Sequence, residues 1–551
     1  MLTVTVYVYN TLMIATEFDY IIIGAGSAGA VLAHRLSADK QVSVCLLEAG
    51  GKDRHPLIHI PFGLAGLSRV TSLNWGHHTA PQPQLNQREL FWPRGKTLGG
   101  SSAINAMCYI RGQYSDYDDW AAAGASGWSA KEVLPVFRRS EHFCDAEDEF
   151  HGVGGPLHVE RLRHIDPLSG AFVSSATEMG LPQLNDFNRQ HREGLGLYHV
   201  TQKNGQRCST AVGFLAHARY QENLTIITRC LAEKILLTDD VATGVQIQHN
   251  GQTVKLKARR EVIVTGGAIN TPQLLMLSGI GPEDELHRHG IAVKKHLPGV
   301  GQNLQDHLDV IIQHSASRAA GYGLAVGAIP GFVTQGVKYL AGRQGMLSSN
   351  IAEAGGFASS SLAGKDKPDL QFHFIPAILN DHGRRFSYGY GYGLHVCNLY
   401  PRSRGRIRLH SSRAESAPLI DPCYLTHPDD LQIMLDGVRL ARRILQASPF
   451  DKWRGQERLP GEDKTSDDAL TAFIRQYAET VYHPAGTCKM GAEDDPLTVV
   501  NSRLQVRGIE NLRVADASVM PSLPGGNTNA PTIMIAEQAA SFIQACHTSP
   551  A

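Results

Sequence analysis

Two side chains far apart in the chain could together carry acid–base chemistry. His483 precedes Pro484, which restricts it to extended backbone, and Gly486 leaves space beside it. An imidazole titrates near neutral pH, so His483 could act as a general base. Asn527 could hydrogen-bond a reacting oxygen, although beside Gly526 it could equally be a turn residue. Because the chain has 25 histidines, a structural or exposed role for His483 stays open on this pattern alone.

A glycine-rich motif near the start of the chain predicts a bound nucleotide. The pattern is strand, tight turn, helix, strand and acid, and its parts are 20–23, Gly24, Gly26, Gly29, 42–47 and Glu48. Gly24 suits the tight turn, Gly26 admits a pyrophosphate to the backbone, and Gly29 lets the helix pack against the strand. The helix N-terminus would face the phosphates, and Glu48 would accept hydrogen bonds from a ribose. An ordinary glycine-bearing turn is the alternative, and the motif leaves open which dinucleotide is bound.

Two further stretches supply loops that could bind or cover a ligand. Residues 94–107 form a Gly/Ser-rich loop that is expected to run into a helix. Bare backbone N–H groups in such a loop could bind phosphate or the edge of a flavin, and a flexible surface turn is the alternative. The polar, aromatic and Pro-rich stretch 52–94 is long for a connection, so we expect it to cover a ligand.

The chain beyond residue 220 predicts more strands beside the nucleotide-binding unit. The expected strands are 224–227, 235–237, 241–248, 252–256 and 261–264. A helix is expected between Gly267 and Ser278, and a later strand, 511–517, carries Asp516 at its tip. A helix is expected from Ile533 onward. The second strand–glycine–helix unit and the late acid are typical of proteins that bind FAD and are not required by NAD, although an aspartate at a strand tip is more often a cap or turn residue.

The sequence pattern of residues 310–480 differs from that of the nucleotide-binding unit. Alternating runs at 370–374 and 394–399 indicate strands, and 431–445 has helical spacing. The pattern indicates a second domain on an antiparallel sheet. The predicted fold class is therefore α/β, or α+β overall: a Rossmann-like nucleotide-binding domain with an interleaved antiparallel-sheet domain.

The bulk properties narrow the function classes. The chain has 551 residues, more than one hydrophobic core usually holds. Basic and acidic residues balance at 52 each, which argues against nucleic acid as a partner. No stretch of about 18 apolar residues occurs, so no membrane span is expected. Nine scattered cysteines without a C-x-x-C pair predict reduced thiols in a cytoplasmic protein, and the histidines lack the companions of a metal site.

The first residues suggest a second possible start of translation. Residues 1–16 are apolar and β-branched, and no basic residue precedes them, which argues against a secretory signal. Met13 lies five residues before Phe18, a usual distance for a start just ahead of a nucleotide-binding strand. The hypothesis is that translation begins at Met13.

Taken together, the motifs resemble the glucose–methanol–choline (GMC) family of FAD oxidoreductases over nearly the whole chain, from Phe18 onward. The stretches that carry the resemblance, besides the glycine motif, are 95–105, 267–281, 483–487 and 527–532. Within the family the chain looks most like the choline-dehydrogenase-like branch. It is similar above all to bacterial membrane-associated alcohol dehydrogenases of alkane oxidation, through 90–96 and 200–207.

The resemblance implies a role for each matching residue. His483 would take the hydroxyl proton, Asn527 would hydrogen-bond the substrate oxygen, and hydride would pass to flavin N5. The residues expected along the cofactor are Gly24, Gly26, Ser27, Ala28, Gly29, Glu48, Ala49, Leu98, Gly99, Gly100, Asn105, Ala106, Met107, Ala232, Asp516, Ala517, Asn529 and Pro531. Some relatives attach the flavin covalently through a histidine where this chain has Ile104, so non-covalent FAD is expected. The FAD-binding domain would comprise 18–160, 205–310 and 485–551, and the substrate-binding domain 161–204 and 311–484.

The implied activity is oxidation of primary alcohols to aldehydes, with electrons passed to quinone or another acceptor rather than to NAD. An oxidase that uses oxygen is an alternative. Choline dehydrogenase is another, for which Glu353 is the one candidate to bind the quaternary ammonium. A different class is an FAD-containing hydroxynitrile lyase, which would keep His483 without reducing the flavin. Peripheral contact with the cytoplasmic membrane is expected by analogy alone.

Overall fold

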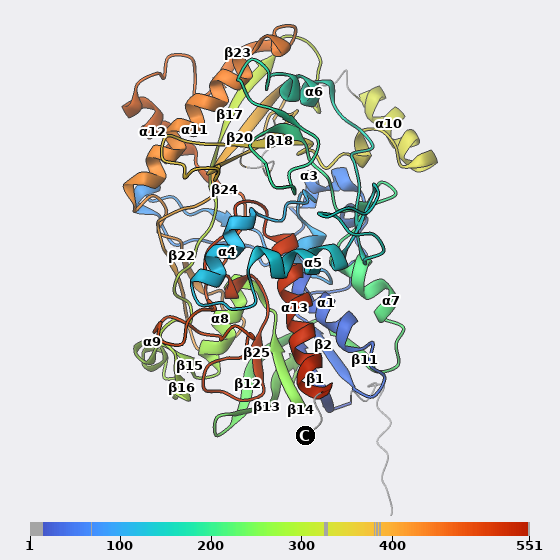
Figure 1. Ribbon diagram of the computed structural model, residues 1–551, viewed down its shortest axis with the longest axis vertical. Coiled ribbons are helices and arrows are strands. Elements are labelled where there is room, and N and C mark those ends of the chain that lie inside the picture. Colours follow the sequence, from blue (N-terminus) through green and yellow to red (C-terminus); the bar gives the residue numbers. More distant parts are fainter. Residues whose placement is uncertain are drawn as a thin grey trace, which may run out of the picture.

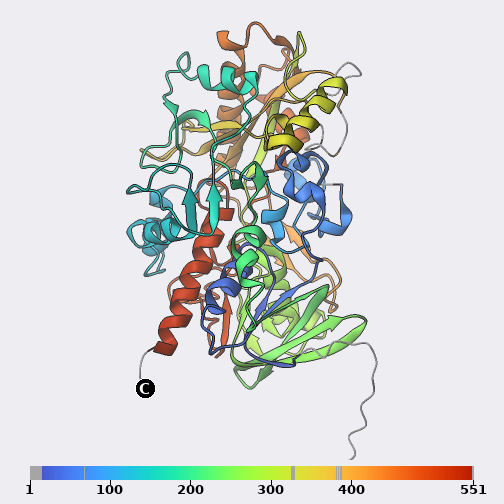
Figure 2. The same ribbon diagram turned by 90° about the vertical axis from the view of Figure 1, so that its right-hand side faces the viewer.

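The computed structural model describes residues 15–67, 69–323, 329–379, 381, 384 and 387–548. The proposed start at Met13 lies outside these residues. Two large sheets lie toward opposite ends of the long axis, with helices and long loops between and around them (Figures 1 and 2). The mixed α/β fold predicted from the sequence is confirmed.

The first sheet has seven strands and is mixed. Its strands are β1 (Glu17–Ile23), β2 (Val44–Glu48), β11 (Leu224–Thr228), β12 (Cys230–Thr238), β13 (Val241–His249), β14 (Gln252–Val264) and β25 (Leu512–Val514). The order is β11-β2-β1-β14-β13-β12, and β25 pairs with the end of β14. The parallel strands β11, β2, β1 and β14 are followed by the antiparallel hairpins of β13 and β12. Residues 20–23 of β1 are buried on both faces, which explains their unbroken apolar run.

Strand β14 corrects one expectation. The sequence predicted separate strands at 252–256 and 261–264, but they form one strand of 13 residues. The first half pairs with β13 and alternates between exposed and buried residues. The second half lies between β1 and β25 and is buried on both faces. The periodicity changes because the burial changes, not because the strand ends.

Two helices pack on this sheet, and a third packs along one of them. Helix α1 (Ser27–Leu36) follows β1, α8 (Gly267–Leu277) follows β14, and α13 (Asn529–Thr548) ends the described chain. Helix α13 begins four residues before the expected Ile533 and packs along α1, as Figure 1 shows. Arg35 of α1 pairs with the buried Glu537 of α13 at 2.8 Å, which ties the last helix to the first.

The second sheet has eight strands and is almost wholly antiparallel. Its strands are β7 (Gln183–Leu184), β8 (Gly194–Leu197), β17 (Leu308–Ala316), β18 (Ala354–Ala358), β19 (Leu370–Ile375), β20 (Gly391–Asn398), β23 (Arg454–Leu459) and β24 (Glu479–Thr480). Helix α11 (Pro428–Gln446) packs on β20, and α6 (Pro167–Ser174) packs on β18 and β8. The antiparallel sheet is confirmed, with β7 parallel to β8 as the exception. The residue boundaries given above for two domains stay a prediction.

The remaining helices and two-stranded pairs lie outside the two large sheets. The other helices are α2 (Pro56–His59), α3 (Leu64–Leu67), α4 (Tyr114–Ala122), α5 (Ala130–Ser140), α7 (Ala216–Ala218), α9 (Glu283–Arg288), α10 (Ile329–Gly342) and α12 (Asp467–Tyr477). The two-stranded pairs are β3 (His77–His78) with β4 (Phe91–Trp92), β5 (Glu141–Phe143) with β6 (Leu157–Val159), β9 (Gln202–Lys203) with β10 (Gln206–Arg207), β15 (Ile280–Gly281) with β16 (Lys295–His296), and β21 (Arg406–Arg408) with β22 (Leu419–Asp421).

The prediction of a helix at the end of the loop 94–107 is wrong. The loop makes a single 3-10 turn, Gly100–Ala103, and Met107 then adopts a positive φ of 61°. A non-glycine residue in that conformation does not continue a helix.

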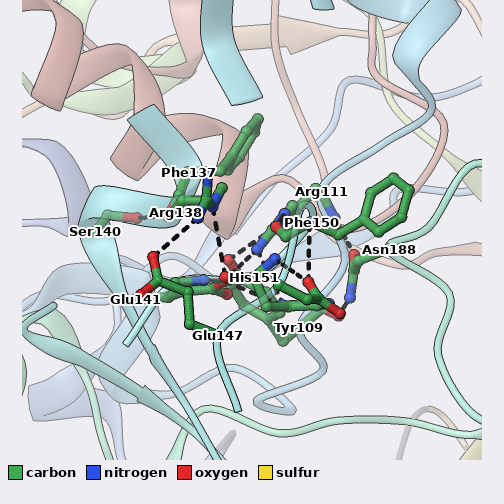
Figure 3. Close-up of polar contacts among 12 residues, drawn as sticks. Tyr109, Arg111, Phe137, Arg138, Ser140, Glu141, Glu147, Phe150, His151 and Asn188 are labelled. Atoms are coloured by element: carbon green, nitrogen blue, oxygen red, sulfur yellow. Dashed lines mark hydrogen bonds and ion pairs between the residues drawn. The ribbon is translucent and has the colours of Figure 1, made fainter. Parts of the chain in front are cut away.

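A buried ionic network links Arg111, Glu141 of β5 and the loop that carries His151 (Figure 3). Arg111 pairs with Glu141, and His151 Nδ1 lies 3.1 Å from Glu141 Oε1. The other ring nitrogen of His151 lies 2.9 Å from Asp186. Burial alone would lower the pKa of His151, but its hydrogen bonds to Asp186 and Glu141 outweigh burial and raise the pKa. The network therefore fixes a region that contains little regular structure.

All nine cysteines are free thiols. Within the described ranges, no helix combines the length and the apolar character needed to cross a bilayer.

Candidate active site

A cavity of about 600 Å³ is lined by residues of both sheets. At one end lie the carboxyl ends of β1 and β2 with Gly24, Gly26 and Glu48. At the other end, on the side of the second sheet, lie His483, which follows β24, and Asn527, which accepts a hydrogen bond from Gln371 of β19. Ligands of open α/β sheets bind at the carboxyl ends of the strands, so one elongated ligand could span the two ends.

The nucleotide end has the geometry that the glycine motif predicted. Gly24 has a φ of +104°, and a Cβ there would lie 2.6 Å from the carbonyl oxygen of Thr265. A Cβ on Gly29 would collide with the carbonyl oxygen of Gly24, so Gly29 allows α1 to pack against β1. Gly26, the N-cap of α1, has no side chain to cap the helix, and it faces the cavity. The N–H groups at this helix start therefore fit a pyrophosphate.

Glu48 lies where a ribose-binding acid is expected. Its Oε2 accepts a hydrogen bond from Ala25 N at 3.0 Å, and its Oε1 accepts one from Gly50 N at 2.7 Å. Burial raises the pKa of Glu48 to about 7, against the opposing effect of these two N–H groups. Each carboxylate oxygen keeps a second lone pair for a ligand hydroxyl.

The loop 94–107 lies against the start of α1. A Cβ on Gly100 would lie 2.7 Å from the Cα of Gly26, so two backbones meet here without side chains. Asn105 Oδ1 accepts hydrogen bonds from Met107 N at 3.1 Å and from Arg207 Nη1 at 2.8 Å. The buried Arg207 thereby fixes the cavity-facing Asn105, in accord with the ligand-binding interpretation of this loop.

Asp516 is a capping residue whose side chain lies at the cavity. Its Oδ2 accepts hydrogen bonds from Gly267 N at 2.8 Å and from Thr271 Oγ1 at 2.6 Å, at the start of α8. Its Oδ1 accepts one from Ser518 N at 2.8 Å. The cap interpretation is therefore confirmed, and Asp516 also lines the cavity.

Most of the predicted site residues line one cavity. Those that do are Gly24, Gly26, Ser27, Ala28, Glu48, Ala49, Gly100, Asn105, Ala106, Met107, Ala232, His483, Asp516, Ala517, Asn527 and Asn529. Four others do not line it: Gly29, Leu98, Gly99 and Pro531. Gly29 serves packing, Leu98 packs on the core, and the N–H of Gly99 donates to Ala25 O at 2.8 Å. Pro531 lies inside the first turn of α13.

A chain of hydrogen bonds sets the tautomer of His483. His307 Nε2 lies 3.0 Å from the carbonyl oxygen of Leu399, and His307 Nδ1 lies 3.0 Å from His483 Nδ1. A carbonyl oxygen only accepts, so His307 Nε2 carries a hydrogen and, in the neutral ring, its Nδ1 is an acceptor. His483 Nδ1 must then donate to His307. This leaves His483 Nε2 as an unprotonated acceptor on the cavity side.

Asn527 presents its amide nitrogen to that acceptor. Asn527 Nδ2 lies 3.2 Å from His483 Nε2, and Asn527 Oδ1 accepts from Gln371 Nε2 at 3.2 Å. Gln371 Nε2 also donates to the hydroxyl of Tyr198, whose own hydrogen goes to Phe372 O at 2.6 Å. These partners fix the orientation of both amides. His483 and Asn527, 44 residues apart, are thus brought together as the sequence pattern suggested.

The surroundings of His483 keep it neutral. Its backbone N–H donates to Asp306 Oδ1 at 2.8 Å, which holds the residue in place. Burial, followed by the nearby His307, His373 and Arg94, holds the pKa of His483 well below its ordinary value. The ring is therefore uncharged at neutral pH and able to accept a proton.

Sequence reasoning missed His307, Asp306, Gln371 and Arg207. Their common feature is a polar or charged side chain that is almost fully buried. In the sequence, Asp306 and His307 stand directly before the apolar start of β17, and Gln371 lies within the apolar strand β19. Polar residues embedded in apolar runs were the available signal.

Glu353 does not serve as a receptor for a cation. Its Oε2 accepts from Asp166 N at 2.8 Å and from Ser169 Oγ at 2.7 Å. Its Oε1 accepts from Ser349 Oγ at 2.6 Å and from the Tyr322 hydroxyl. The carboxylate is fully buried, and Glu353 lies outside the cavity wall.

The cavity near His483 is mainly apolar. Its lining there includes Phe62, Leu64, Tyr322, Ile351, Ala352, Ile375, Ala377, Ile378, Leu379 and Val481. Several further wall residues come from the stretch 52–94, namely Ala65, Arg69, Trp75, Pro93 and Arg94. Residues of this stretch therefore line the cavity, and its covering of a ligand stays a prediction.

Comparison with known proteins identifies the family of the chain. The two GMC oxidoreductase family models match residues 18–309 and 401–536. The chain is 52% identical over 529 residues to an alcohol dehydrogenase [acceptor] of Pseudomonas putida, covering 96% of this chain and 95% of that protein. It is 43% identical to an oxygen-dependent choline dehydrogenase of Photobacterium profundum, covering 96% and 93%.

Solved structures resemble the whole chain. A pyridoxine 4-oxidase from Mesorbium loti superposes with a TM-score of 0.86 at 30% identity, covering 97% of this chain and 100% of the other. An FAD-dependent oxidoreductase from Chaetomium thermophilum gives a TM-score of 0.87 at 27% identity, again covering 97% and 100%. The family matches and these full-length similarities show that the chain belongs to the GMC oxidoreductases.

Proposed function

We propose that this protein oxidises primary alcohols to aldehydes, with FAD as its cofactor and His483 as the base. The observation that carries the proposal is the unprotonated Nε2 of His483, 3.2 Å from the amide nitrogen of Asn527. Both atoms belong to residues of the cavity whose other end has the geometry of a dinucleotide site. The similarity to an alcohol dehydrogenase over nearly the full chain supports it.

The residues at the apolar end can do the required acid–base work. An alcohol hydroxyl placed between the two side chains donates its hydrogen to His483 Nε2, and Asn527 Nδ2 donates to the alcohol oxygen. As the proton moves to His483, Asn527 stabilises the charge that develops on oxygen. Bound FAD would supply the acceptor, at N5, for the hydride of the carbinol carbon. Loss of one proton and one hydride converts the alcohol to the aldehyde.

We expect FAD to be held without a covalent bond. Ile104 lines the cavity where some relatives carry the linking histidine, and a hydrocarbon side chain cannot form that bond. Denaturing the yellow protein with acid should therefore release all of the flavin absorbance into the supernatant after precipitation. Flavin that stays with the pellet after washing would contradict this expectation.

The proposed substrates are apolar primary alcohols. Among the residues that the structure describes, the carboxylates of the cavity wall are Glu48 and Asp516, both at the nucleotide end. Choline is the second candidate, because a choline dehydrogenase is 43% identical and because two rings, Phe62 and Tyr322, line the apolar end. Their centroids lie 5.1 Å apart, edge to face.

An anaerobic panel of aliphatic alcohols, benzyl alcohol and choline tests the substrate class. Aliphatic and benzylic alcohols should bleach the flavin at far lower concentrations than choline does, because an unpaired ammonium is costly to bury. Preference for choline would overturn the substrate assignment. With the preferred alcohol, reduction of a quinone or dye without peroxide supports the proposed non-NAD acceptor, whereas peroxide formation at a matching rate identifies an oxidase.

We further propose that the protein is cytoplasmic and that it contacts an anionic bilayer through α10. Val333, Val337 and Leu340 lie on one face of this helix and are 64%, 61% and 87% exposed. Lys338 and Arg343 are exposed beside them, and the sequence from 310 to 352 contains no Asp or Glu. This combination of apolar and basic side chains suits an interfacial helix. Figures 1 and 2 show α10 beside α3, a short helix of the stretch 52–94, residues of which line the cavity.

Sedimentation with vesicles tests this surface. The protein should sediment with vesicles of phosphatidylglycerol and phosphatidylcholine, and Val337→Glu combined with Leu340→Glu should abolish sedimentation. Tyr220→Glu, which changes a large side chain that is 77% exposed elsewhere on the surface, is the control and should sediment like the wild type. A double variant that still sediments contradicts the surface. Loss of a dimer in the double variant would instead assign this face to a second copy of the chain.

A further inference from the structure

Two charged side chains from the first half of the chain hydrogen-bond to the loop that carries Asn527. Asp116 of α4 accepts a hydrogen bond from Gly525 N through Oδ2, at 2.7 Å. Arg192, just before β8, donates from Nη2 to the carbonyl oxygen of the same Gly525. Both side chains are buried, with 2% exposure each. One residue of the loop is therefore held at its donor and at its acceptor, which fixes the peptide planes on both sides.

The surroundings leave this loop little freedom. A Cβ on Gly525 would collide with the hydroxyl of Tyr400, and that hydroxyl donates to Asp116 Oδ1 at 2.8 Å. Gly526 has a φ of +145°, and a Cβ there would collide with Ile110. The chain must therefore pass through this gap as two glycines, and it emerges directly at Asn527.

The buried positive charge of Arg192 beside Gly525 needs an explanation. Burying a guanidinium is costly, and in the described structure the Nε and Nη1 atoms of Arg192 have no hydrogen-bond partner. Its guanidinium carbon lies 3.6 Å from the centre of the Phe357 ring, so packing alone could be met by an apolar side chain. The hydrogen bond that an apolar side chain could not replace is the one to Gly525.

We propose that Asp116 and Arg192 are positioning residues that aim the Asn527 amide at His483. The proposal rests on the function proposed above for Asn527. Asn527 Nδ2 must stay near His483 Nε2 while Oδ1 stays on Gln371, and both distances are 3.2 Å. A displacement of about 1 Å at a reacting group can cost on the order of 10²-fold in rate.

A double-mutant cycle on the flavin-loaded enzyme tests the positioning role. Arg192→Met and Asp116→Ala should each slow anaerobic flavin reduction by the preferred alcohol by about 10- to 100-fold. Rescue by Arg192→Lys should be incomplete, because an ammonium is more strongly hydrated than a guanidinium and therefore costs more to bury. In an Asn527→Ala background the same changes should cost less than about threefold, because residues that act through one group are not additive. Hydrogen exchange of the peptide covering 521–527 should rise in Arg192→Met and Asp116→Ala.

Asp430→Asn is the matched control, because Asp430 is as buried as Asp116 and also accepts from backbone N–H groups, those of Arg402 and Ser403. It should leave the flavin reduction rate and the 521–527 exchange unchanged. Additive losses in the cycle, or unchanged exchange in Arg192→Met, would overturn the positioning role while leaving the proposed function intact. If Asn527→Ala itself reduces flavin at the wild-type rate, the role of Asn527 fails first, and the positioning role fails with it. Should Asp116→Ala not fold, the two Arg192 variants complete the cycle.

Discussion

Replacing His483 by alanine is expected to slow flavin reduction by an alcohol by about 10²- to 10⁴-fold, the usual contribution of a general base. The variant loses the acceptor that the His307 hydrogen bond holds ready on the cavity side. It should keep its FAD, because His483 lies at the opposite end of the cavity from Gly24, Gly26 and Glu48. Anaerobic stopped-flow absorbance measures the rate, and the visible spectrum of the purified variant measures bound flavin.

The pH dependence of the wild type sharpens this test. Because burial and the neighbouring side chains lower the pKa of His483, its neutral form persists below pH 6.5, and the rate should hold as the pH falls through that value. His314→Ala is the control, since His314 is buried in β17 against Tyr392 and lies outside the cavity wall. Flavin reduction at the wild-type rate in His483→Ala would remove this residue from the mechanism.

Gly29→Ala should yield a protein that does not retain FAD. The added methyl group would collide with the carbonyl oxygen of Gly24 and would lie 2.8 Å from Thr265 Oγ1. The first obstacle is backbone, so α1 must move away from β1, and overpacking of this kind costs about 1–3 kcal/mol of stability. That movement also displaces the helix start that faces the cavity. The measurement is the ratio of flavin to protein after gel filtration, together with the thermal unfolding midpoint.

Gly170→Ala is the matched control for this change. Gly170 also lies in a helix, α6, and a Cβ there meets no atom within 4 Å. Alanine at such a site should stabilise the helix by about 0.5–1 kcal/mol and leave FAD content unchanged. A Gly29→Ala protein with one flavin per chain would contradict the packing argument.

Local patterns predicted the fold of the nucleotide end well, because its elements lie within one short motif. The spacing from Gly24 to Gly29 and the acid at Glu48 follow from a single strand–turn–helix–strand unit. The pattern failed where burial, rather than secondary structure, changed along the chain. Strand β14 was divided in two because its second half alone is buried on both faces.

The apolar end could not be predicted to the same depth. His307 and His483 are 176 residues apart in the sequence. They meet because His307 directly precedes β17, His483 follows β24, and β24 pairs with β17. The tautomer of His483 depends on that contact, and so does its chemistry. Glu353 shows the converse: its side chain suits a cation, but partners from distant segments, such as Ser169, already bind its oxygens.

The most direct test of the account is the anaerobic reaction of the flavin-loaded protein with an apolar primary alcohol, unlabelled and with both carbinol hydrogens replaced by deuterium. The account predicts complete bleaching of the flavin, one aldehyde formed per flavin, and slower bleaching with the deuterated alcohol, because the carbinol C–H bond breaks as His483 takes the hydroxyl proton. An oxidised flavin that stays unchanged with every alcohol, while a cyanohydrin is cleaved, would contradict the account and identify a lyase.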